Sequence, residues 1–172
     1  MTFEGALPDD AIERIPITKN PDVCGTGERE VVWADVKDGA LRDAFVFIAK
    51  IKEGKALRGA RGRQLSEGCR FTPWARVVRR GPITIRNNDQ GVLHNINMRE
   101  TIGVEKGRVV KRTMFNFGQP DPGDIQQDIK PRRSSFIGLN CEAHNFMFGF
   151  MMAPTHPYAV VVGEDGSYTK ER

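Results

Sequence analysis

Short apolar runs rich in Val, Ile and Phe recur along the chain and are separated by clusters of Gly, Pro, Asn and Asp. Runs of this kind, bounded by turn-forming residues, are typical of β-strands. No long segment has a convincing helical pattern. We therefore expect an all-β fold of the sandwich or barrel type. The expected strands lie within residues 31–36, 44–49, 76–78, 83–85, 92–96, 101–117, 136–139, 146–152 and 158–162.

Turn signals connect several of these runs. Asp38-Gly39 separates the first two, which predicts a pair of strands, and Glu105-Lys106-Gly107 divides residues 101–117 into two further strands. The run 146–152 is apolar at odd and even positions alike, as expected for a strand covered on both faces. Residues 125–129 are compatible with a helical turn, and residues 164–167 predict a C-terminal hairpin.

The length and composition indicate one domain. A chain of 172 residues, of which 39% are hydrophobic and 28% charged, can form one core of moderate size. Prolines in the first residues, followed by Gly25 and Gly27, predict an irregular segment over 1–27 and a patterned domain over 28–172. No stretch approaches the roughly 18 apolar residues of a membrane-spanning helix, so we expect no membrane span.

The charge balance adds one expectation about partners. The 26 Lys and Arg residues exceed the 22 Asp and Glu residues, which gives a formal charge of +4. Basic residues gather in segments 52–67, 76–80 and 130–133, but aromatic residues are few and no nucleic-acid recognition motif accompanies them. We therefore expect solvated loops that help to dock an acidic partner, and no nucleic-acid binding.

Cysteine and histidine are scarce, with three of each, and His94 and His144 fall in unusual contexts. Cys141, His144 and Met147 are spaced three residues apart after an apolar run, and His94 precedes them on a different expected strand. One thiolate, two imidazoles and a weak thioether donor are the ligand set of an electron-transfer copper centre. Zinc is the chemical rival, but a thioether is a poor zinc ligand. His156 precedes a proline, and we interpret it as a turn residue.

These motifs resemble those of the cupredoxins, the small blue-copper family. The loop from Cys141 to Met147 is similar to that of amicyanin-type members, and segment 81–96, which ends in His94-Asn95-Ile96, resembles the family's first histidine strand. Segment 68–73 and His156-Pro157-Tyr158 resemble an exported bacterial branch described as plastocyanin-like or methylamine-utilisation-like. The resemblance implies a Greek-key β-sandwich with extra loops, in which Asn95 forms hydrogen bonds around the copper site.

The resemblance also implies a function. The chain is expected to bind one copper ion, to cycle it between Cu(I) and Cu(II), and to carry single electrons without being an enzyme itself. Its partner would be a redox protein such as a c-type cytochrome or a copper or haem oxidoreductase with an acidic docking surface. Two alternatives stay open. One is a copper chaperone or storage protein, and the other is a β-sandwich interaction module whose Cys and His residues are structural.

Location and the remaining cysteines follow from the same resemblance. The family is exported, and we expect a periplasmic or exported protein, although the chain begins without a secretory leader. If Cys141 binds the metal, Cys24 and Cys69 are expected to form a disulfide, which an oxidising compartment permits.

The ligand loop carries two finer expectations. The ring edge of His144 is expected to emerge through an apolar patch and to serve as the electron exit. Met147, rather than Met151 or Met152, is expected to be the axial ligand.

Overall fold

The computed structural model describes residues 1–56 and 62–169, so part of the basic loop, residues 57–61, lies outside the described residues. The main body contains two β-sheets, and the larger has five strands in the order β11-β10-β13-β14-β8. Its pairs are antiparallel except for β14 with β8, which is parallel. The strands are β8 (Ala75–Val77), β10 (His94–Glu105), β11 (Arg108–Gln119), β13 (Phe136–Asn140) and β14 (Phe148–Met152).

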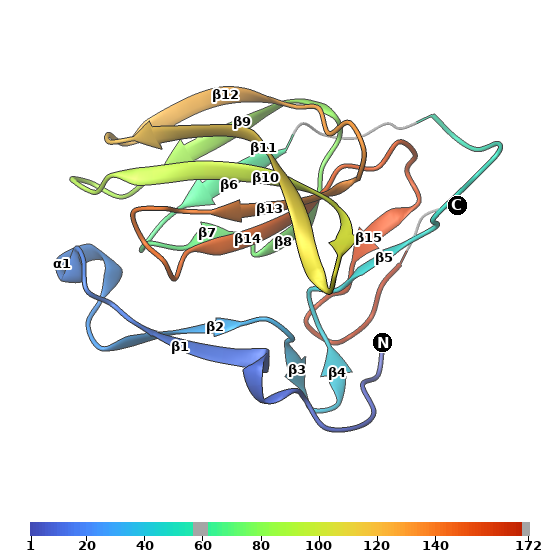
Figure 1. The fold of residues 1–172 in the computed structure, drawn as a ribbon, viewed down its shortest axis with the longest axis horizontal. Helices are drawn as coiled ribbons and strands as arrows, with labels where there is room; N and C mark the ends of the chain where they lie inside the picture. The colour runs from blue at the N-terminus through green and yellow to red at the C-terminus, as the bar shows by residue number, and fades with distance from the viewer. Residues whose placement is uncertain (57–61, 170–172) are drawn as a thin grey trace.

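The second sheet has four strands in the order β12-β9-β6-β7. They are β6 (Arg63–Ser66), β7 (Phe71–Thr72), β9 (Gly81–Asn87) and β12 (Gly123–Ile129). The chain passes from β9 to the larger sheet for β10 and β11, returns for β12, and crosses again to β13 (Figure 1). These crossings between layers confirm the predicted Greek-key β-sandwich.

The core lies between the two sheets. Side chains alternate between buried and less buried positions along β9, as the two-residue period of a strand requires. Ile83 and Ile85 of β9 are fully buried, as are Ile96 and Met98 of β10. The Val- and Ile-rich runs of the sequence therefore form the inner faces of the sandwich, where burial of apolar surface stabilises the fold.

Some local predictions were wrong. Residues 125–129 belong to strand β12 and are not helical, because every residue of β12 pairs with β9 and its burial alternates with period two. Asp38-Gly39 does form a turn, but between the short strands β3 (Val36–Lys37) and β4 (Ala40–Leu41). The run expected to pair across that turn instead forms β5 (Phe45–Phe47), which pairs with β15 (Ala159–Val161). After β15, the N–H of Gly163 bonds to the carbonyl of Ser167, which closes the expected C-terminal turn.

The N-terminal segment is more ordered than the sequence indicated. It forms a 3-10 turn η1 (Asp9–Ala11), strand β1 (Ile12–Pro16) and a short helix α1 (Pro21–Cys24). β1 then pairs with β2 (Glu28–Val32) across the boundary expected at residue 27. Figure 1 shows this hairpin beneath the sandwich, with α1 at the end where β13 turns into β14. Within the described residues, no helix is long and apolar enough to cross a membrane.

Candidate metal centre

A tight loop holds Cys141 and His144 together. It connects the adjacent antiparallel strands β13 and β14, whose last pair is Asn140 with Phe148. The N–H of Cys141 bonds to the carbonyl of Met147, and the N–H of Met147 bonds to the carbonyl of His144, both at 3.1 Å. This folding turns the two side chains toward each other, so that Sγ of Cys141 lies 3.6 Å from Nδ1 of His144.

The register of the sheet brings His94 to the same loop. Asn97 of β10 pairs with Asn140 at the end of β13, so His94 lies just beyond that end, beside Cys141. The potential ligand atoms of His94, Cys141 and His144 lie within 4.8 Å of one another, and all three side chains are buried. The structure therefore brings together three of the four predicted ligands from two separate parts of the chain.

Each imidazole is held by its outer nitrogen. Nε2 of His94 donates to Oδ2 of Asp89 at 2.7 Å, and Nε2 of His144 donates to Oδ1 of Asn20 at 2.9 Å. Nδ1 of His94 is buried without a hydrogen-bond partner in the part of the chain that the structure describes. A buried imidazole nitrogen without a partner, whose opposite nitrogen bonds to a carboxylate, is the arrangement of a metal-ligating histidine.

The electrostatic setting suits a soft metal ion. Burial, together with the neighbouring His94, lowers the pKa of His144 to about 4, so its imidazole is neutral at pH 7 and can act as a ligand. Burial also raises the pKa of the Cys141 thiol, although the backbone N–H of Asn95 points at Sγ from 3.2 Å. A bound cation would favour the thiolate there. One thiolate and two imidazoles fit copper.

Asn95 links the two parts of the site, as the resemblance implied. Its side-chain oxygen accepts a hydrogen bond from the N–H of Glu142 at 3.3 Å. Its amide nitrogen donates to Oδ1 of Asn116 at 2.7 Å and to the carbonyl of Phe117 at 3.3 Å. Asn95 therefore ties the His94 strand to the Cys141 loop and to β11.

Met147 is buried in the same loop, next to the core. Met151 and Met152 are buried too, but they lie within β14, where they pair with Ile137 and Phe136. The assignment of Met147 as the axial ligand stays a prediction. His156, which we interpreted as a turn residue, accepts a hydrogen bond at Nδ1 from the N–H of Tyr158 at 3.3 Å.

The predicted disulfide between Cys24 and Cys69 is present, and it lies against the candidate metal centre. Its sulfur atoms and a ring nitrogen of His144 lie within 4.8 Å of one another, as do Cys69 Sγ, an Asp89 oxygen and a ring nitrogen of His94. Asp89 also accepts hydrogen bonds from the N–H groups of Gly68 at 2.7 Å and Cys69 at 2.9 Å. One carboxylate therefore fixes both the disulfide loop and the His94 ring.

The expectation that the ring edge of His144 emerges through an apolar patch is wrong. The side chain is only 2% exposed, and its Nε2 is bonded to Asn20 of the N-terminal segment. Its role as the electron exit stays a prediction. Sequence reasoning missed Asn20 because 124 positions separate it from His144 and no motif links them. Asp89 carried a usable signal, since it lies in the Asn-Asn-Asp turn five residues before His94.

No protein-family model and no curated protein matches the chain. Among solved structures, it is similar to a purple cupredoxin from Nitrosopumilus maritimus, at 15% identity and a TM-score of 0.40, over 54% of this chain and 99% of the other. An amicyanin variant in its reduced Cu(I) form has 13% identity and a TM-score of 0.40, over 57% and 86%. A second amicyanin variant, in the oxidised state, has 15% identity and a TM-score of 0.35, over 65% and 93%. Likeness this remote assigns no role to the chain.

Proposed function

We propose that this chain is a type 1 copper protein that carries single electrons between redox partners and catalyses no reaction of its own. One copper ion would be held by His94, Cys141 and His144, with Met147 as a weak axial donor. The observation that carries this proposal is the buried Nδ1 of His94, which has no hydrogen-bond partner among the described residues and belongs to a cluster of thiol and imidazole donors.

The surrounding residues hold the donors in place. Bound copper would supply a one-electron Cu(I)/Cu(II) couple. Asp89 and Asn20 fix the two imidazole rings from outside, and the N–H of Asn95 donates to the sulfur of Cys141. Because the three donor side chains are buried and each is held by one of these contacts, they have little freedom to rearrange when the charge changes, which favours fast electron transfer.

The enclosure of the site favours a carrier over a chaperone that must release its ion. His144 is covered by the N-terminal segment, and the disulfide ties that segment to the Cys69 loop. Release of the ion past His144 would require the segment to move. A carrier, by contrast, needs only electrons to pass.

We also propose an exported, periplasmic setting and a redox partner. The disulfide supports an oxidising compartment. The formal charge of +4 supports a partner with an acidic docking surface, such as a c-type cytochrome or a copper or haem oxidoreductase. The rate of electron exchange with such a partner should fall as salt is added.

The deciding experiment is a visible absorption and EPR spectrum of the purified protein after addition of one equivalent of Cu(II). A strong thiolate-to-copper charge-transfer band is expected, and it should be absent in Cys141→Ser and retained in His156→Ala. If no such band forms, or if Cys141→Ser keeps it, the proposal fails. If the band forms as expected, a second measurement distinguishes a carrier from a delivery protein: a carrier should be reduced reversibly without loss of copper.

A further inference from the structure

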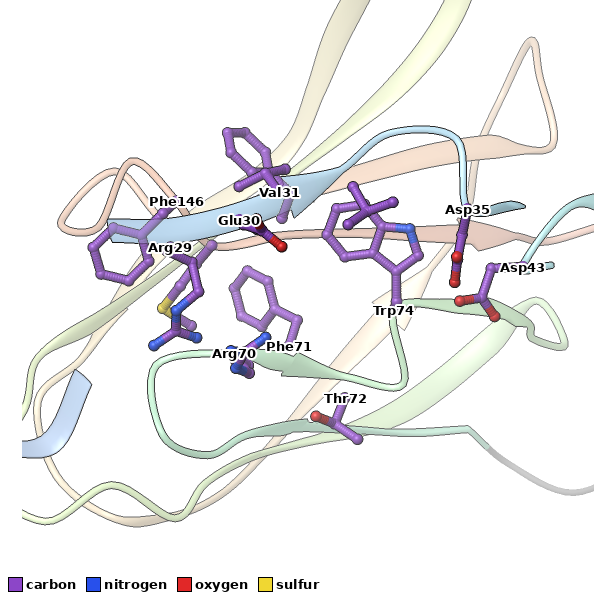
Figure 2. A pocket seen from close by; sticks show the side chains of 13 residues that line it. Arg29, Glu30, Val31, Asp35, Asp43, Arg70, Phe71, Thr72, Trp74 and Phe146 are labelled. Carbon is purple, nitrogen blue, oxygen red and sulfur yellow. The ribbon is translucent and has the colours of Figure 1, made fainter. Parts of the chain in front are cut away.

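A cleft of about 290 Å³ lies between the N-terminal hairpin and the sandwich. Strand β2 forms one wall, and segments 70–74 and 146–148 form the other. Figure 2 shows the head groups of Arg29 and Arg70 at one end and the carboxyl groups of Asp35 and Asp43 at the other, with Phe71 and Trp74 between them. The cleft is therefore basic at one end, acidic at the other and apolar in the middle.

Arg29 is the unusual residue of this cleft. Its side chain is only 7% exposed, yet it forms no ion pair with any carboxylate in the described part of the chain. Nη2 donates to the carbonyl oxygens of Cys24 at 2.5 Å and Gly68 at 3.3 Å, whereas Nη1 is buried and has no partner among residues 1–56 and 62–169. A buried guanidinium without a counter-charge is costly, so an anion bound here would stabilise the protein.

Arg70 adds a second positive charge at the same end. Its side chain is exposed, and it lines the cleft together with Arg29. Burial, and after it the charge of Arg70, lowers the pKa of Arg29. Glu30 also lines the cleft, but its carboxylate is bonded to Arg14 at 3.0 Å and 3.2 Å. A place therefore remains for an external anion beside the two arginines.

The rest of the cleft restricts what this anion can be. Phe71 and Phe146 present apolar walls, and the Arg29 guanidinium lies 5.3 Å from the centre of the Phe146 ring. At the far end lie the carboxyl groups of Asp35, which pairs with Arg42 at 2.6 Å, and of Asp43, so the charge at that end is acidic and the lining there offers a second anionic group no basic partner. A second anionic group on the ligand would therefore be disfavoured there.

We propose that the cleft binds a small organic monocarboxylate. Its carboxylate group would bond to Arg29 and Arg70, and its apolar body would lie against Phe71, Phe146 and Trp74. Guanidinium groups suit this role because their N–H donors match the two oxygens of a carboxylate. The proposal does not depend on copper and is tested on the copper-free protein.

The experiment is calorimetric titration of the copper-free, disulfide-intact protein with benzoate as the probe and the neutral benzamide as its matched control. Saturable benzoate binding is expected, with no measurable binding of benzamide. Arg70→Gln should weaken benzoate binding about tenfold or more, because a charge-assisted hydrogen bond is lost. Arg29→Gln should weaken it at least as much. Arg108→Gln, an equal change of charge on β11, should leave it unchanged.

A second measurement places the apolar body. In the ¹H–¹⁵N NMR spectrum, the indole signal of Trp74 should shift as benzoate binds. Because Arg70 is exposed, Arg70→Gln keeps the test valid even if Arg29→Gln does not fold. Absence of benzoate binding, equal binding in wild type and Arg70→Gln, or a Trp74 signal that does not move would each overturn the proposal. Binding of inorganic phosphate as tightly as benzoate would also overturn it, because the apolar body would then contribute nothing.

Discussion

Replacement of Asp89 by Asn should weaken the structure around the candidate metal centre far more than an isosteric change suggests. The carboxylate is buried and accepts three hydrogen bonds. Oδ1 accepts from the N–H of Gly68, and Oδ2 accepts from the N–H of Cys69 and from Nε2 of His94. An asparagine has only one oxygen, so its NH₂ group must face at least one of these donors.

The magnitude follows from counting these contacts. In the better of the two amide orientations, the oxygen serves Cys69 and His94, and the NH₂ group faces the N–H of Gly68. An unsatisfied donor costs about 1–3 kcal/mol, and loss of the carboxylate's charge weakens the two remaining bonds further. We expect Asp89→Asn to lower the free energy of unfolding by about 2–4 kcal/mol, a large share of the 5–15 kcal/mol typical of such domains.

The assay is urea denaturation of the copper-free protein at pH 7 with the disulfide intact. Asp124→Asn is the matched control, because Asp124 pairs with Arg86 on the surface, where an ion pair contributes about 0–1 kcal/mol. If Asp89→Asn unfolds at the wild-type urea concentration, or if Asp124→Asn costs as much, the assigned role of Asp89 is wrong.

Three further predictions concern Glu100, Asn20 and Met147. Glu100 is buried, which by itself raises its pKa. Its carboxylate accepts hydrogen bonds from Arg112 and from the N–H groups of Arg133 and Ser134, and these bonds outweigh burial and lower the pKa to about 2. Glu100→Gln should therefore destabilise the protein by about 2–4 kcal/mol at pH 7. The stabilisation by Glu100 is present above its unfolded pKa of about 4.5 and is lost as the pH falls toward 2. The free energies of unfolding of wild type and variant, measured by urea denaturation, should therefore converge near pH 2, and a difference that does not change with pH would refute this. The backbone φ of residue 20 is 49°, which glycine adopts without strain, so Asn20→Gly should be tolerated. In the copper-free variant, ¹⁵N NMR should then show both neutral tautomers of the His144 ring, whereas Asn20→Asp should keep Nε2 protonated. Identical spectra for Asn20→Gly and wild type would contradict this role. In the copper-loaded protein, voltammetry should show a lower reduction potential for Met147→Gln and a higher one for Met147→Leu than for wild type. If neither variant changes the reduction potential, Met147 is not the axial donor.

The sequence alone determined the features that are encoded locally. The short runs rich in Val, Ile and Phe and the turn residues between them predicted an all-β sandwich, because β-branched and aromatic side chains suit strands and Gly, Pro, Asn and Asp suit the turns that connect them. The spacing of Cys141, His144 and Met147 identified the candidate ligand loop, because three donors only three residues apart must lie on the same short loop between two strands. His94 was added as the second imidazole because it lies on a different expected strand, and the resemblance to the cupredoxins added Asn95 and the disulfide between Cys24 and Cys69.

Strand β12 shows where local patterns fail. Its Gln and Asp residues give a weak apolar signal, and its strand character comes from pairing with β9 along its whole length. The N-terminal hairpin was hidden in the same way, since its two strands are joined by a segment with Pro21, Gly25 and Gly27 that resembles irregular chain.

The tertiary structure alone decided the surroundings of the candidate metal centre. The register of β10 against β13 sets His94 beside Cys141, and a shift of one residue would turn its side chain to the other face. The contact between Asn20 and His144, the burial of His144 and the burial of Arg29 all arise where the N-terminal segment packs against the sandwich. Such contacts join residues far apart in the chain, and their free energy depends on packing and desolvation, which no short stretch of sequence encodes.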